Sequence, residues 1–132
     1  MPVKTNPVQE KPYKLVFERR KGYLRVQLTG QRGTYQLSRG AWAEIAEHCK
    51  KHGFTKVLLE KDLRKDISII EMLELISALP ELGLGSTIVA IVDRNSQRNE
   101  LNEFGETAAS NRGLQHRFFP DADKAEKWLL GG

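Results

Sequence analysis

Between Val57 and Leu130 the chain alternates apolar runs of strand length with amphipathic segments of helical length. The order is strand then helix three times over, and the run Thr87–Val92 is almost wholly apolar and rich in β-branched residues, which is typical of a strand covered on both faces. Strands joined through helices run parallel, because each helix carries the chain back to the edge where the strand began. The pattern therefore predicts a mostly parallel sheet with helices packed on it.

The residues before this region predict an antiparallel start. Tyr13–Glu18 and Tyr23–Thr29 alternate apolar and polar residues, and a short turn that ends in Gly22 separates them, which indicates a β-hairpin. A helix is expected from an N-cap at Ser38 to a stop at Gly53. Together the segments predict a single α/β domain over residues 13–130 with the order ββαβαβαβα.

The length and the termini are typical of one cytoplasmic domain. A chain of 132 residues can bury a core without covalent cross-links. Residues 1–12 contain three prolines and few apolar residues, which predicts a flexible leader without the apolar centre of a signal peptide. No apolar run approaches the roughly 20 residues that cross a bilayer. The single cysteine, Cys49, excludes an internal disulfide and is expected to be a core residue.

The net charge of +4 is unevenly distributed, because residues 1–37 carry eight Lys or Arg against two Glu and so hold +6. A basic surface of this kind attracts nucleic acid or acidic partners. A solvated hairpin turn explains the same residues, and we take nucleic-acid binding as the weaker alternative.

Polar residues gather after two predicted neighbouring strands, and the carboxyl ends of parallel strands are where ligands bind in open sheets. Strand-to-helix loops are polar in most α/β domains, so a solvated loop is the other interpretation. An acidic trio, Glu60, Asp62 and Asp93, could hold Mg²⁺, but carboxylates facing water are the better explanation, and we expect no metal and no cofactor. The first loop, expected from Lys61 to Asp66, and the cap that follows supply Glu60, Asp62, Asp66 and Ser68, and the second supplies Asp93, Arg94, Asn95 and Ser96.

Ser68 and Glu71 form the sequence pattern of a capping box. The Ser68 hydroxyl would accept from the Glu71 backbone N–H, and the Glu71 carboxylate would accept from the Ser68 N–H. A phosphate on Ser68 would be stabilised by the same helix N-terminus, with Arg64 and Lys65 as counter-charges. Capping alone and capping with modification both stay open.

Residues that could carry catalysis do not form a recognisable motif. His48 and His52 share one helix face at the spacing of a zinc-binding pair, but no glutamate follows His48 and no third ligand is evident. His116 falls in a predicted strand as a core or edge residue. A nucleophile elbow and a phosphate-binding glycine loop are both missing from the sequence, so we expect a protein that is not an enzyme.

The last third of the chain carries a family resemblance. Phe104–Gly113, Arg117–Phe119 and Ala125–Leu129, in this arrangement of elements, resemble the SpoIIAA-like branch of the STAS superfamily, which comprises domains of anti-sigma factor antagonists and sulfate transporters. The resemblance covers residues 13–130. It implies a small regulatory domain of bacterial-type signalling that docks on protein partners without catalysing a reaction.

In regulatory members of that family a partner kinase phosphorylates a serine in an Asp-Ser-Ser-Gly pattern. The pattern falls here on Asp66-Ile67-Ser68-Ile69, so that Asp66 and Ser68 match and Ile67 and Ile69 do not. The resemblance therefore implies a docking domain without the full phosphoserine motif.

Two hypotheses of function remain. The first is a protein-interaction domain that docks through Lys61–Ser68 and the adjoining helix. The second is a carrier or sensor of a small apolar, lipid-like ligand, as in relatives that resemble lipid-binding domains. Ile67 and Ile70 lie beyond the apolar stripe that one helix face needs, so they are expected at a partner surface, a homodimer contact or a pocket wall.

Overall fold

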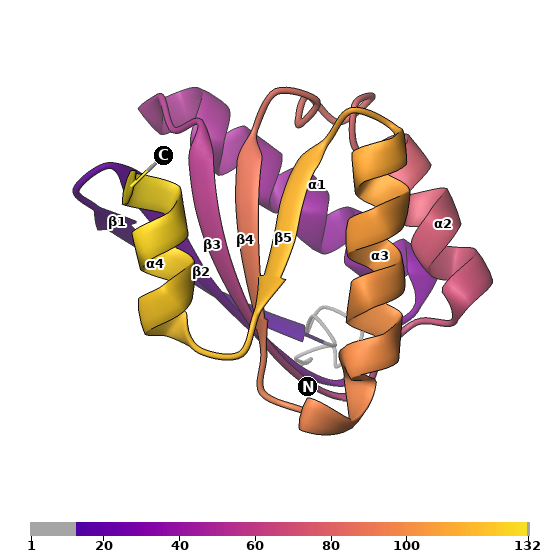
Figure 1. Cartoon of the computed structure of the whole chain (residues 1–132). Helices are drawn as coiled ribbons and strands as arrows, with labels where there is room; N and C mark the ends of the chain where they lie inside the picture. Colours follow the sequence, from indigo (N-terminus) through magenta and orange to yellow (C-terminus); the bar gives the residue numbers. More distant parts are fainter. Residues whose placement is uncertain (1–12, 132) are drawn as a thin grey trace, which may run out of the picture.

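The computed structural model describes residues 13–131, and the expected leader at residues 1–12 lies outside them. Within the described residues five strands form one sheet in the order β1-β2-β3-β4-β5 (Figure 1). β1 and β2 run antiparallel, and each later neighbouring pair runs parallel. The predicted fold class and element order are confirmed. The elements are β1 (Tyr13–Arg20), β2 (Tyr23–Arg32), α1 (Tyr35–His52), β3 (Lys56–Lys65), α2 (Ile69–Ala78), β4 (Ile88–Asp93), the 3-10 turn η2 (Ser96–Arg98), α3 (Asn99–Asn111), β5 (Gln115–Phe119) and α4 (Ala122–Gly131).

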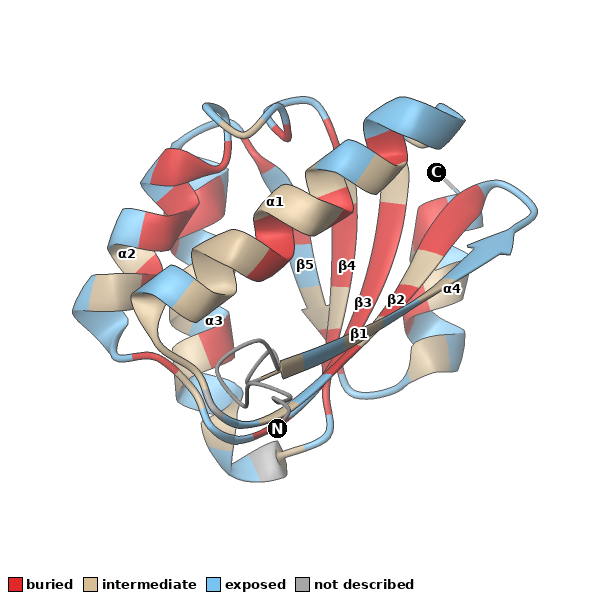
Figure 2. Ribbon diagram, turned by 180° about the vertical axis from the view of Figure 1, so that it is seen from behind, coloured by how far each residue is buried: buried red, intermediate tan, exposed pale blue. Residues whose placement is uncertain are grey.

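Helices cover both faces of the sheet, α1, α2 and α3 on one side and α4 on the other (Figures 1 and 2). The parallel strands are added in one direction, and parallel crossovers are right-handed in nearly all proteins, so the three connecting helices share a face. α4 follows the last strand and packs on β3, β4 and β5 from the opposite side. Successive side chains of β3 alternate between two cores: Val57 and Leu59 join the core under α1, α2 and α3, and Leu58 joins the core under α4.

The hairpin forms as predicted. Arg20 and Tyr23 are register partners, and Lys21 and Gly22 make the turn between them. Gly22 has φ +91°, a conformation that favours glycine. The turn therefore depends on glycine at this position.

The expected loop from Lys61 to Asp66 is wrong, because β3 continues to Lys65. β4 pairs with β3 only as far as Lys61, and beyond that point β3 pairs with β2 alone, up to Arg32 opposite Lys65. The pairing of β2 with β3 ends just beyond this point, where the Gly33 backbone N–H donates to the Lys65 carbonyl at 2.6 Å. Charged residues dominate this stretch, and a strand with one apolar side chain, Leu63, looks like a loop in the sequence.

The start of α1 also differs from the prediction. Thr34 is the N-cap, since its hydroxyl accepts from the Leu37 backbone N–H at 3.2 Å. Ser38 lies inside the first turn, where its own N–H donates to the Thr34 carbonyl. Gly53 ends the helix as predicted, with φ +76°. Among residues 13–131 no helix has the length and apolar character that a membrane span requires.

Candidate functional site

A buried charge network joins the ends of β3 and β4 to helices α2 and α3. Lys61 Nζ lies 2.7 Å from Asp66 Oδ2 and 3.9 Å from Asp93 Oδ2. Arg98 donates to both carboxylate oxygens of Asp93 at 3.0 Å, and Asn102 Nδ2 donates to the same carboxylate at 2.9 Å. Two cations thus balance two carboxylates, as buried charges require.

Asp93 is the centre of this network, with a side chain that is fully buried. Burial alone would raise the pKa of Asp93, but hydrogen bonds from Arg98, Asn102 and the Asn95 backbone, with the nearby Lys61 ammonium, outweigh it and hold the pKa below its ordinary value. Asp93 is therefore ionised at neutral pH.

Asp66 connects the network to the start of α2. One carboxylate oxygen binds Lys61, and the other accepts from the Ile67 backbone N–H at 2.7 Å. The Arg98 guanidinium also donates to the Leu63 carbonyl at 2.7 Å, at the edge of β3 where β4 no longer pairs with it. The network therefore holds the projecting end of β3 in place.

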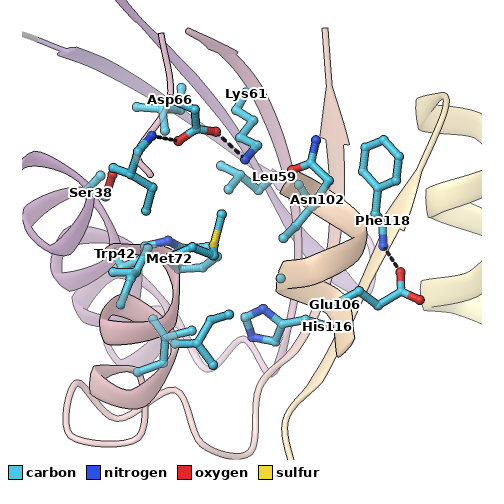
Figure 3. A pocket seen from close by; sticks show the side chains of 18 of the residues that line it. Ser38, Trp42, Leu59, Lys61, Asp66, Met72, Asn102, Glu106, His116 and Phe118 are labelled. Atoms are coloured by element: carbon cyan, nitrogen blue, oxygen red, sulfur yellow. Dashed lines mark hydrogen bonds and ion pairs between the residues drawn. The ribbon is translucent and has the colours of Figure 1, made fainter. Parts of the chain in front are cut away.

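A cavity of about 60 Å³ lies next to the network, lined by the sheet, α1, α2 and α3. Figure 3 shows Lys61, Asp66 and Asn102 at one end of it and His116 toward the other. Apolar side chains line the space between, and Met72 projects into it. The cavity is therefore an apolar chamber with polar groups at two ends.

His116 has an unusual environment in this chamber. Its Nε2 atom is buried and has no hydrogen-bond partner among the described residues. Burial lowers the pKa of His116 to about 4, so the imidazole is neutral at pH 7. Trp42 packs against the ring, with centroids 5.9 Å apart. Buried polar atoms without a partner are rare and call for an explanation.

The volume of the cavity limits what it can hold. A cavity of roughly 150 Å³ holds one benzene ring. At about 60 Å³ the chamber accommodates a ring only if a flexible lining side chain such as Met72 moves.

Glu60, Asp62 and Arg94 lie on the opposite face of the sheet from Asp93. The Glu60 carboxylate is 4% exposed and accepts from Arg25 at 2.9–3.2 Å and from Arg94 at 3.5 Å. Asp62 lines a shallow hollow on the same face. The three carboxylates considered for Mg²⁺ therefore do not share one site, and residues 13–131 contain no cluster of three or more His, Cys, Asp or Glu that could hold a metal ion.

The start of α2 carries the capping box that the sequence predicts. Glu71 N–H donates to Ser68 Oγ at 3.2 Å, and Ser68 N–H donates to the Glu71 carboxylate at 3.1 Å. Ile69 and Ile70 follow and are 55% and 72% exposed. The exposed residues on either side of Asp66 and Ile67 make up what we call the α2 patch: Arg64, Lys65, Ser68, Ile69 and Ile70.

The remaining predicted site residues are separated from this patch. Ile67 is 4% exposed and lines the cavity, so it faces inward and not toward a partner. The Asn95 side chain caps η2, which Ser96 begins. His48 stacks on Phe17 at 4.1 Å between ring centroids. Burial raises the pKa of the Cys49 thiol to about 11, which makes it an inert core residue as predicted.

Sequence reasoning missed Arg98 and Asn102 and did not foresee the burial of Lys61. The signal available was spacing. Arg98 and Asn102 are four residues apart, so the helix predicted after Asp93 would place both on one face. The burial of Lys61 depends on the continuation of β3, which the sequence does not indicate.

Comparisons with known proteins support the fold. No family model matches the chain, and no curated protein matches it. An anti-sigma factor antagonist from Mycobacterium paratuberculosis superposes with a TM-score of 0.59 at 15% identity, over 89% of this chain and 94% of that one. An uncharacterised protein of the DUF3478 family with a SpoIIAA-like fold, from Shewanella loihica PV-4, gives 0.57 at 14% identity, over 97% and 99%. The chain has a SpoIIAA-like fold, and the resemblance expected from its sequence is confirmed at the level of the fold.

Proposed function

We propose that this SpoIIAA-like domain is a non-enzymatic regulator that docks on a protein partner through the α2 patch. The observation that carries the proposal is the exposure of two adjacent isoleucines, Ile69 and Ile70, at a helix start. Large aliphatic side chains in water are an energetic cost that a partner surface removes. One of the solved structures with this fold is an anti-sigma factor antagonist, and we propose a regulatory partner for this chain by analogy with it.

The charges of the α2 patch indicate the character of the partner. Arg64 and Lys65 are exposed and precede the isoleucines in the chain, and no ion pair with an acidic side chain of the described residues holds either one. An apolar centre with basic neighbours fits an acidic rim around an apolar groove. We propose that Asp66 acts in this surface as a positioning residue, because its side chain is buried and holds the Ile67 backbone.

Ser68 lies within the same patch, and we propose it as the residue that a partner kinase would modify. Its hydroxyl is exposed at a helix N-terminus, and Arg64 and Lys65 precede it. Phosphate there would repel the Glu71 carboxylate from its half of the capping box, because it would place a dianion beside that carboxylate, while the helix N-terminus still favours the phosphate. Modification would therefore release the partner.

Photo-crosslinking in the protein's own cells tests the docking surface. A photoreactive amino acid at position 70 is expected to capture one protein of fixed size, while the same group at Lys127, exposed on α4, captures none. With the captured protein purified, Ile70→Ser should weaken binding at least tenfold and Lys127→Ser should leave it unchanged. Equal capture at both positions, or equal affinity of both variants, would remove the proposal.

A second candidate function rests on the cavity. We propose that the chamber binds a small, mostly apolar molecule with one hydroxyl, since a hydroxyl both donates and accepts and so satisfies His116 Nε2 in either tautomer. Phenol and toluene test this because they differ only in the hydroxyl. Chemical shifts of cavity residues should move with phenol more than with toluene, and His116→Phe should abolish the difference. Identical responses to both compounds would contradict this candidate.

A further inference from the structure

β1 is an edge strand with one free side. It pairs with β2 along all eight of its residues, and no described residue pairs with its outer edge. Figure 2 shows β1 at the margin of the sheet, in front of β2. Native proteins protect long edges with proline, bulges, short length or charged side chains. β1 has no proline or bulge within its span, and its protection is charge, from Lys14, Glu18, Arg19 and Arg20. The strand is therefore a template for pairing with a chain whose charges complement these.

The sequence of β1 is complementary to itself in one antiparallel register. When Val16 lies opposite Val16 of a second copy, Lys14 lies opposite Glu18 and Leu15 opposite Phe17, each pair occurring twice. Tyr13 then lies opposite Arg19. Opposite charges and apolar pairs directly across two strands each contribute about 0.2–1 kcal/mol.

Registers shifted by two residues place less favourable pairs of residues opposite one another. Sliding the second copy by two residues in one direction places Lys14 opposite Arg20 and Val16 opposite Glu18. Sliding it in the other direction shortens the overlap and leaves Lys14 opposite Val16. Like charges opposite one another are destabilising. The charges therefore select the register that is centred on Val16.

The side chains of this register are available. Val16 is 42% exposed, and Lys14 and Glu18 are exposed on the same face of the sheet. Pairing would cover Val16, one of the exposed large apolar side chains of the described residues, with its own copy. Glu18 already contacts Arg25 at 3.2 Å, which orients its carboxylate on this face.

The charges of helix α1 are also complementary between the two copies. Tyr13 donates to Glu44, and Arg19 lies 3.2 Å from His52. Since Tyr13 faces Arg19 of the second copy, the two α1 helices would run antiparallel. Each Glu44 would lie toward the basic last turn of the other helix, which contains Lys50 and Lys51.

We propose that two copies of this chain pair through their β1 strands, antiparallel and centred on Val16, to form one continuous ten-stranded sheet. The partner is a second copy of the chain. The proposal does not depend on the α2 patch, because the dimer forms from the pure protein without any docked partner.

Sedimentation of the full chain over a concentration series tests the dimer and its charges. The wild type is expected to dimerise reversibly, and Lys14→Glu or Glu18→Lys alone should weaken the dimer at least tenfold. The double variant K14E/E18K restores opposite charges across the interface and should recover most of the affinity. Lys127→Glu on α4 is the control for a charge change alone.

A disulfide trap tests the register. Cα atoms directly opposite in antiparallel strands are about 4.5–5.5 Å apart, within the range of a disulfide. Val16→Cys should therefore form a covalent dimer with oxidised glutathione, and Glu18→Cys should not, because it faces Lys14. A wild type that stays monomeric at all concentrations, a dimer insensitive to both charge changes, or equal trapping at positions 16 and 18 would overturn the proposal.

Discussion

Arg98 donates two parallel hydrogen bonds of 3.0 Å to Asp93, one to each carboxylate oxygen. The pair lies where β4 ends and α3 begins, and its carboxylate is fully buried. Bidentate geometry of this kind is the strongest form of a charged hydrogen bond. The pair therefore joins the end of β4 to the start of α3 beside the cavity.

Asp93→Asn leaves the buried Arg98 and Lys61 cations with one carboxylate, that of Asp66, between them. We expect a loss of about 3–5 kcal/mol in the free energy of unfolding, because an uncompensated buried charge is costly. Urea denaturation at pH 7 measures it. Glu81→Gln, which removes an exposed pair with Arg39, is the control and should change stability by at most about 1 kcal/mol. Equal effects of the two changes would contradict the role of the network.

His116 makes stability depend on pH. Its pKa is about 4 in the folded chain against 6.5 as a free side chain, so the unfolded state binds more protons between those values. Stability is therefore full above pH 6.5 and falls as the pH drops toward 4, by on the order of 3 kcal/mol in total. His116→Phe should flatten this slope in urea denaturation at pH 7, 5.5 and 4.5. Burial also lowers the pKa of His48, but it titrates in both proteins and cancels in the comparison.

The capping box gives a matched pair of variants at one position. Ser68→Ala removes the acceptor for the Glu71 N–H and should cost about 1 kcal/mol. Ser68→Asn supplies an equivalent cap without charge and should stay within a few tenths of a kcal/mol of the wild type. Thermal and urea denaturation both report the difference. If alanine were as stable as asparagine, Ser68 would contribute nothing as a cap.

Ile67 and Ile70 are three residues apart and differ in burial, at 4% and 72% exposed. Ile67→Ala empties part of the cavity wall and should cost about 2–5 kcal/mol. Ile70→Ala should change the free energy of unfolding by no more than about 0.5 kcal/mol. A large loss at position 70 would mean that this side chain supports the fold and is not free to dock.

The strand and helix order follows from local patterns, and so do Ser68 as a cap and the exposure of Ile70. The extension of β3 does not, because its pairing with β2 joins residues 33 positions apart, such as Arg32 and Lys65, and the extension carries one apolar side chain, Leu63. The buried charge network follows from that extension and was missed with it. The cavity beside His116 depends on how whole side chains fill a volume, which no periodicity encodes.

Asp66 connects the cavity to the α2 patch. One oxygen of its carboxylate binds the Lys61 ammonium at one end of the cavity, and the other accepts from the Ile67 backbone N–H, directly before Ser68 of the α2 patch. A shift of this carboxylate therefore alters both places at once. Thermodynamic linkage is reciprocal, so whatever occupies the cavity and displaces Asp66 changes affinity at the α2 patch by the same factor that docking there changes affinity in the cavity.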